Sequence, residues 1–119
     1  MNRLKHLILP ILATIVTIIG SGISAARAKE LLPMDLFSQD KLLHFGCYFI
    51  LTVLWAYGLV KIKTKRPISK SLIVTILVGI IMEVCQYLFF EGRVFEFLDI
   101  IANISGSLIG ALVFIKIIK

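Results

Sequence analysis

The stretch EVCQYLFFEGRVFEFLDIIAN (Glu83–Asn103) decides the fold, because two long apolar runs of the sequence meet within it. Its middle, Glu91–Arg93, is polar and suits a short connection between two helices. Four other polar residues lie inside the apolar runs instead: Glu83, Gln86, Asp99 and Asn103. Polar groups are costly inside long apolar segments, so these four residues are either a packing network or a site.

The composition indicates a membrane protein. Apolar residues make up 59% of the 119 residues, against roughly 45–50% in soluble domains, and the mean hydropathy is +0.99. About 20 apolar residues are needed to cross a bilayer as a helix. Four segments reach this length: 7–26, 42–60, 71–90 and 98–118. We therefore expect an all-α, polytopic membrane protein with four transmembrane helices in one antiparallel bundle, forming a single domain over residues 1–119.

The charges predict how the bundle is oriented. Nine positive residues and no acid lie at the N-terminus, between the second and third segments, and at the C-terminus: Arg3, Lys5, Lys61, Lys63, Lys65, Arg66, Lys70, Lys116 and Lys119. The other four (Arg27, Lys29, Lys41 and Arg93) lie on the side that carries all seven acidic residues. Because short basic loops stay in the cytoplasm, we expect both termini inside and the 27–41 and 91–97 connections outside. Membrane lipids, whose anionic headgroups suit the basic 61–70 loop, are expected partners, and nucleic acid is not.

The N-terminal segment allows a second interpretation. It has a basic start, an apolar core and Ala26-Arg27-Ala28, which resembles a signal-peptidase site. We favour an uncleaved anchor, because the apolar run reaches Ala26 and is long enough to span the membrane. Two further expectations concern single residues: Ser38 as the N-cap of the second helix, and Cys47 and Cys85 as packing residues rather than a disulfide or metal pair.

Each of the last three helices is predicted to carry one polar stripe at helical spacing. The stripes are Asp40, His44 and Tyr48 with Lys41 at the edge; Thr75, Gly79, Glu83 and Gln86; and Asp99, Asn103, Gly106 and Gly110. Gly79 and the Gly106-x-x-x-Gly110 pair suit close helix packing. The stripes concentrate in the outer halves of the helices, whereas the inner halves are apolar apart from Thr52, Trp55, Tyr57 and Thr75.

These stripes have two interpretations. In the first they only pack the bundle, with Lys41 and Arg93 neutralising the acids. In the second they line a water-accessible pocket that opens outward, since ionisable groups inside a membrane are functional candidates. The candidate ligand-binding residues are Asp40, Lys41, His44, Tyr48, Glu83, Gln86, Arg93, Asp99 and Asn103. Within this set, His44 and Glu83 are the candidate acid–base pair, and Lys41 and Arg93 suit a phosphate or carboxylate at the mouth. No cofactor is expected, and no metal, because His44 is the single histidine on that side.

The sequence resembles the VanZ-like family of small bacterial membrane proteins. The resemblance rests on an Asp-Lys-x-x-His-x-x-x-Tyr helix start, a Glu-x-x-Gln pair followed by Arg, and an Asp-x-x-x-Asn-x-x-Gly-x-x-x-Gly helix. The matching residues are Asp40, Lys41, His44, Tyr48, Glu83, Gln86, Arg93, Asp99, Asn103, Gly106 and Gly110. The resemblance implies the bacterial cytoplasmic (inner) membrane and an association with the cell envelope. The family is named for a protein encoded with glycopeptide-resistance genes, which confers low-level teicoplanin resistance.

Four functions remain open from the sequence. The first is a protein whose outward pocket binds or shields an envelope component, such as a lipid-linked or peptidoglycan-derived group. The second is an enzyme acting on a lipid-linked headgroup, with Glu83 and His44 as acid and base. The third is a structural or accessory subunit, and a homo-oligomer is compatible with each. A proton-coupled transporter is disfavoured, because the polar stripes are expected to stop before the cytoplasmic side.

Overall fold

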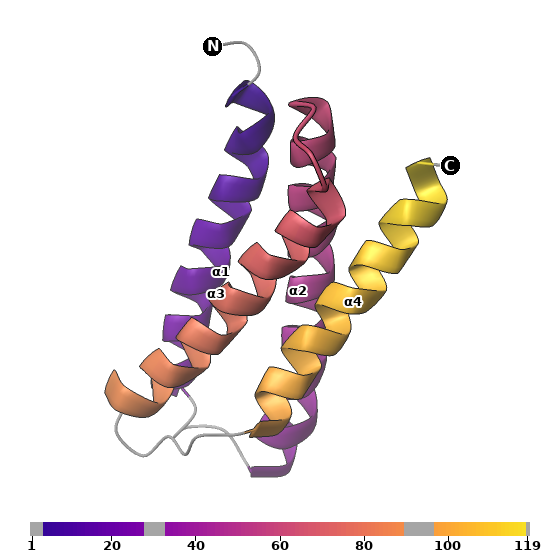
Figure 1. The fold of residues 1–119 in the computed structure, drawn as a ribbon. Coiled ribbons are helices and arrows are strands. Elements are labelled where there is room, and N and C mark those ends of the chain that lie inside the picture. The colour runs from indigo at the N-terminus through magenta and orange to yellow at the C-terminus, as the bar shows by residue number, and fades with distance from the viewer. Residues whose placement is uncertain (1–3, 28–32, 90–96, 119) are drawn as a thin grey trace.

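The computed structural model describes the backbone of residues 4–27, 33–89 and 97–118, and this part contains helices and turns but no strand. The side chains of residues 21–27, 33–41, 43, 86, 89 and 97 lie outside the description. A short 3-10 helix, η1 (Leu4–Leu7), precedes four α-helices: α1 (Ile8–Arg27), α2 (Pro33–Lys61), α3 (Pro67–Phe89) and α4 (Phe97–Ile118). Consecutive helices run in opposite directions, and both chain ends lie at the same end of the bundle (Figure 1).

The all-helical, membrane-type prediction is confirmed. Three helices contain stretches long and apolar enough to cross a membrane: His44–Lys61, Pro67–Cys85 and Leu98–Ile118. At the N-terminus, the side chains of the apolar stretch are described only over Leu4–Gly20, and this part does not reach the length of the other three. Three predicted segments, 7–26, 71–90 and 98–118, agree with α1, α3 and α4 to within about one helical turn.

The predicted start of the second helix is wrong. α2 begins at Pro33, so Ser38 lies inside the helix and is not its N-cap. The connection to α1 is correspondingly shorter than the expected 27–41. Proline suits the first helical position, because its fixed φ matches the helix and its missing N–H would have no partner there. Each helix is located in the sequence from its apolar run. Pro33 lies before the apolar run 42–60, so this method misses the true start of α2.

The surface of the bundle is more apolar, and its interior more polar, than in a typical soluble protein. Many large apolar side chains are exposed, such as Val16 at 67%, Leu42 at 72% and Ile73 at 58%. The interior contains a large share of polar groups: Thr52, Ser71, Thr75, Glu83, Asp99, Asn103 and Ser107 are all buried. A surface of this kind is stable in lipid, where exposed apolar groups are not penalised and buried polar groups hydrogen-bond across helices.

Glycines bring the helix backbones together. Gly106 and Gly110 of α4 lie against the backbone carbonyls of Phe45 and Phe49 in α2, and a Cβ added at Gly110 would lie 2.6 Å from the Phe49 oxygen. Gly79 of α3 lies against the side chain of Asn103, and a Cβ added at Gly79 would lie 2.9 Å from the Asn103 Nδ2. The Gly106-x-x-x-Gly110 face therefore belongs to the α2–α4 contact and sets how closely these two helices approach.

Candidate functional site

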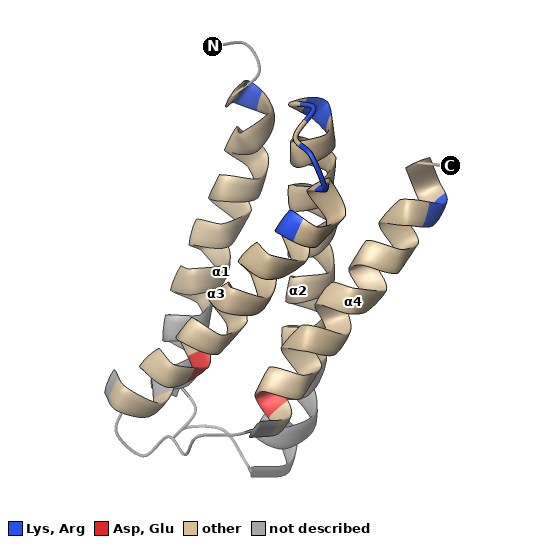
Figure 2. Cartoon of the chain, viewed as in Figure 1, with Lys and Arg blue, Asp and Glu red and all other residues tan. Residues whose placement is uncertain are grey.

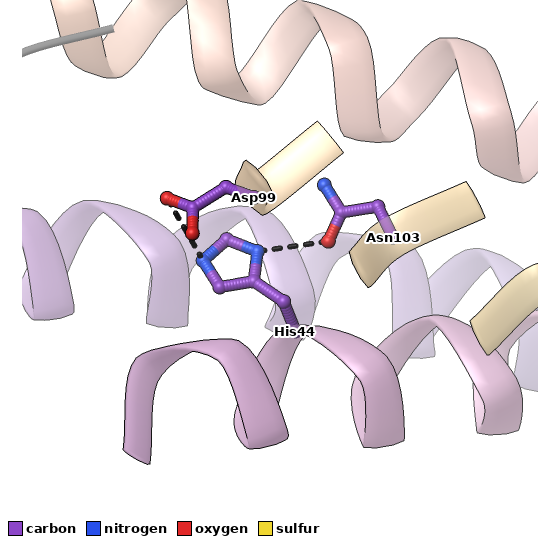
Figure 3. Close-up of polar contacts among 3 residues, drawn as sticks. All are labelled: His44, Asp99 and Asn103. Carbon is purple, nitrogen blue, oxygen red and sulfur yellow. Dashed lines mark hydrogen bonds and ion pairs between the residues drawn. The ribbon is translucent and has the colours of Figure 1, made fainter. Parts of the chain in front are cut away.

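The side chain of His44, on α2, lies between two side chains of α4 (Figure 3). Its Nδ1 is 2.8 Å from Asn103 Oδ1, and its Nε2 is 4.0 Å from Asp99 Oδ2. Asp99 is fully buried, and the His44 side chain is only 11% exposed. Asp99 and Asn103 are one helical turn apart, so both can reach the same imidazole ring.

The hydrogen bond to Asn103 determines which nitrogen of His44 carries a proton. An amide oxygen can only accept, so Nδ1 donates to Asn103 Oδ1. Nε2, which faces Asp99, then carries a proton only when the ring is the positively charged imidazolium. In that form the ring places a positive charge beside the buried Asp99 carboxylate and offsets part of its desolvation cost. His44 can therefore take up or release a proton at Nε2, beside Asp99, while Asn103 orients the ring.

Two further buried polar side chains lie one helical turn from residues of this region: Tyr48 follows His44 on α2, and Glu83 follows Gly79, which packs against Asn103, on α3. Glu83 is 2% exposed and Tyr48 is 1% exposed, and their polar groups are close enough to interact electrostatically. Among the residues that the structure describes, the Tyr48 hydroxyl has no hydrogen-bond partner. Buried hydroxyl groups are normally hydrogen-bonded, so the Tyr48 hydroxyl has the capacity to bind another molecule.

The charged groups are divided between the two ends of the bundle (Figure 2). The lysines and arginines whose side chains are described lie toward the end that carries both termini, whereas the acidic residues whose side chains are described lie toward the other end. The site is therefore displaced from the middle of the bundle, away from the basic end. This arrangement has the same sense as the charge separation found in the sequence.

Four of the predicted site residues are outside this description. Asp40 and Lys41 belong to α2 and Gln86 belongs to α3, but their side chains are not described. Arg93 lies outside the described residues altogether. The mouth formed by Lys41 and Arg93 therefore stays a prediction.

A family model described as VanZ/LLP1 matches residues 6–119, which is nearly the whole chain. The chain belongs to the VanZ/LLP1 family. The match includes η1 in part, all four α-helices and every residue of the site, so the resemblance noted in the sequence is confirmed. No curated protein and no solved structure matches the chain.

In this VanZ/LLP1 protein a cluster of buried hydroxyl groups continues from the site toward the basic end. Thr75 Oγ1 lies 2.9 Å from Thr52 Oγ1 and 3.1 Å from Ser107 Oγ, and it also donates to the Ser71 carbonyl at 3.0 Å. We name Thr52, Thr75 and Ser107 the hydroxyl cluster; the Ser71 hydroxyl is also buried, but it donates to the Ile68 carbonyl at 2.8 Å. It contradicts the expectation that the inner halves are apolar apart from Thr52, Trp55, Tyr57 and Thr75.

Ser71 and Ser107 are missed by the sequence pattern, although a signal for both was present. Ser71 lies four residues before Thr75 on the α3 stripe, and Ser107 lies four residues after Asn103 on α4. Both residues are fully buried. The predicted α4 stripe continues from Asn103 to Gly106 and Gly110. A buried helix face is wide enough to include Ser107 beside these glycines.

The cysteines of this VanZ/LLP1 protein are free thiols, and Cys47 is exposed whereas Cys85 is half-buried. The expectation that Cys47 is a packing residue is therefore wrong. Its neighbour Tyr48 faces the interior, and successive helical residues point about 100° apart, so Cys47 faces outward. Among the described side chains, no group of three or more His, Cys, Asp and Glu residues is arranged to hold a metal ion.

Proposed function

We propose that this VanZ/LLP1 protein spans the bacterial cytoplasmic membrane four times, with both termini in the cytoplasm, and that its outer half binds or shields a cell-envelope component. The ligand class is a lipid-linked or peptidoglycan-derived group. The observation that carries the proposal is the buried His44–Asp99–Asn103 cluster at the end opposite the basic residues. A link to glycopeptide (teicoplanin-type) resistance is the phenotype we would test first.

The proposed topology is supported by the basic residues and by the way in which α1 packs. The positive charges gather at the end that carries both termini, as expected for a cytoplasmic face (Figure 2). Trp55 of α2 donates its indole N–H to Thr14 Oγ1 of α1 at 2.9 Å. The backbone of His6 lies against Gly58, 2.7 Å from where a Cβ would stand. These contacts favour a retained first helix over a cleaved signal peptide.

A ligand site explains the charged cluster better than packing alone. Hydroxyl groups can join the helices at little desolvation cost, and the hydroxyl cluster already does so between α2, α3 and α4. Burying Asp99 and Glu83 in the same bundle is much more costly. The buried Tyr48 hydroxyl, which has no partner among the described residues, supplies a donor for the ligand.

The second candidate function is an enzyme acting on a lipid-linked headgroup. The observation that favours it is the imidazole of His44, which is oriented by Asn103 on one side and faces a carboxylate on the other. Such a ring can serve as general acid or base. The sequence pattern pairs His44 with Glu83, and the structure also places the Asp99 carboxylate 4.0 Å from the ring. A purely structural or accessory role is the third candidate.

The binding proposal is tested by identifying the lipids that co-purify with the protein by mass spectrometry. The samples are the unchanged protein, Glu83→Gln, His44→Asn and the control Ile101→Leu, which changes a side chain that is 43% exposed on α4. We expect one lipid-linked species to be enriched with the unchanged protein and the control, and lost from the two site variants. Identical lipids in all four samples refute the proposal.

Two further readouts separate the alternatives. If the site variants lose the lipid only in proportion to a loss of folded protein, the residues have a structural role. If the purified protein converts the bound species over time and His44→Asn does not, the protein is an enzyme. The topology is tested in a background without Cys47 and Cys85, by labelling Lys65→Cys and Gly92→Cys in intact cells with an impermeant maleimide. Labelling at 65 rather than at 92 would overturn the orientation.

A further inference from the structure

The turn between α2 and α3 holds two positively charged residues in the left-handed backbone region. Lys63 has φ of 59° and Arg66 has φ of 54°. Residues with a Cβ are disfavoured in this region, whereas glycine enters it freely. The Lys63 N–H donates to Val60 O at 3.0 Å and the Thr64 N–H donates to Leu59 O at 3.2 Å, the two hydrogen bonds of a Schellman motif at the end of α2. Lys63 occupies the left-handed position of this motif, where glycine is the usual residue. Strained residues of this kind often serve a function.

The same turn is a dense cluster of exposed positive charges. We name it the basic turn, and it consists of residues 61–70 with Lys61, Lys63, Lys65, Arg66 and Lys70, all exposed. η1 packs beside it through the contact of His6 with Gly58, which brings the exposed Lys5 to the same end of the bundle. The acidic residues whose side chains are described lie toward the other end, so they do not neutralise this cluster (Figure 2).

The residues on either side of the basic turn are typical of those near a membrane surface. Tyr57 is 49% exposed on α2, and tyrosine is enriched at the boundary between hydrocarbon and water. The Lys61 ammonium lies 5.3 Å from the centre of the Tyr57 ring, a cation–π distance. One turn of α3 beyond the basic turn, Ile73 is 58% exposed, as expected for a residue in hydrocarbon. The charges therefore lie just outside the apolar belt.

We propose that the basic turn binds the phosphate of an anionic phospholipid in the leaflet next to both chain ends, and that Lys63 and Arg66 occupy left-handed positions because their charges are needed there. An arginine guanidinium can bind two phosphate oxygens at once, and lysines add point charges around them. The proposal goes beyond the attraction of any basic loop to a membrane, because it assigns the binding to specific positions. It does not depend on the His44 site or on its ligand.

The test measures thermal unfolding of the purified protein in a neutral detergent, with and without added lipid. The variants are Lys63→Gly, Arg66→Gly and the double variant, and the control is Lys116→Ala, which removes an exposed charge at the same end but on α4. Without lipid, we expect each glycine variant to unfold at a higher temperature than the unchanged protein, because glycine relieves the left-handed backbone. With phosphatidylglycerol, we expect half-saturating concentrations to rise about fivefold for each charge removed from the turn.

Each outcome decides the proposal. It stands if the glycine variants gain stability in detergent but respond less to phosphatidylglycerol, while Lys116→Ala responds as the unchanged protein does. It is overturned if the glycine variants respond to the lipid normally, or if Lys116→Ala loses as much as they do, because the attraction is then diffuse. It is also overturned if phosphatidylcholine stabilises equally well, or if inorganic phosphate alone reproduces the shift, since the ligand is then not an anionic lipid.

Discussion

The substitution Gly106→Ala tests the contact that holds α4 against α2. A Cβ at this position would overlap the backbone carbonyl oxygen of Phe45, and it would lie 3.0 Å from the carbonyl carbon and 3.1 Å from the Cα. Ordinary contacts between such atoms are about 3.5–4.0 Å. Because all three atoms belong to the α2 backbone, none can rotate away. We therefore expect α4 to withdraw from α2 by about 1 Å.

The magnitude follows from three effects. Alanine favours the helical state over glycine by about 1 kcal/mol. Overpacking a tight contact costs about 1–3 kcal/mol. Because Asn103 is on the same face three residues earlier, the withdrawal also weakens its 2.8 Å hydrogen bond with His44, which is worth about 1 kcal/mol. We expect a net loss of about 1–3 kcal/mol in the free energy of unfolding.

The matched control is Gly46→Ala on α2, where, the backbone of α2 itself aside, no atom of the described residues lies within 4 Å of an added Cβ. It makes the same chemical change and should raise stability slightly, through helix propensity alone. The assay is reversible unfolding of the purified proteins in a neutral detergent, followed by circular dichroism. A second readout is the imidazole nitrogen NMR signal of His44, which should move in Gly106→Ala and stay unchanged in Gly46→Ala. If Gly106→Ala is as stable as Gly46→Ala, the close approach of α2 and α4 is wrong.

Three other predictions concern hydrogen bonds between helices. Thr75→Val should destabilise the protein by about 1–3 kcal/mol in thermal unfolding, because it removes the hydroxyl group that the buried hydroxyls of Thr52 and Ser107 contact. Thr75→Ser keeps a hydroxyl group and should keep most of the stability. Trp55→Phe removes the donor to Thr14, so limited proteolysis should cut the N-terminal helix faster, and an unchanged rate would contradict the docking of α1. Asn103→Asp retains an oxygen acceptor for His44 Nδ1 and Asn103→Leu does not, so lipid retention should survive only the first change.

The helices could be predicted from the sequence because the membrane imposes a length on apolar runs. The polar stripes could be predicted for the same reason, since a polar side chain in such a run turns to the interior, and His44, Asp99 and Asn103 do so. The start of α2 at Pro33 could not be predicted in this way, because it lies outside the apolar run. Helix length there depends on local preferences and not on membrane thickness.

The partners within the site were harder to predict than its location. A stripe identifies the face of a helix, but it does not say which helix lies opposite or at what height. The close contact of Gly106 with Phe45 sets the relative height of α2 and α4, and it brings His44 to Asp99 and Asn103. The stripes alone do not decide whether Asp99 or Glu83 is the carboxylate beside the imidazole of His44.

Different residues hold the helices together and supply the charges. In lipid, apolar burial does not drive helices together, so close backbone contact and interhelical hydrogen bonds must do so. The glycine contacts of α4 and the hydroxyl cluster around Thr75 provide both, and neither uses a charged group. The charged cluster of His44 and Asp99 lies toward one end of this scaffold, where it adds a large desolvation cost to a bundle that has other means of association. A bundle that needed only to associate would be simpler without that cluster, which is the physical reason for proposing that the cluster binds a ligand.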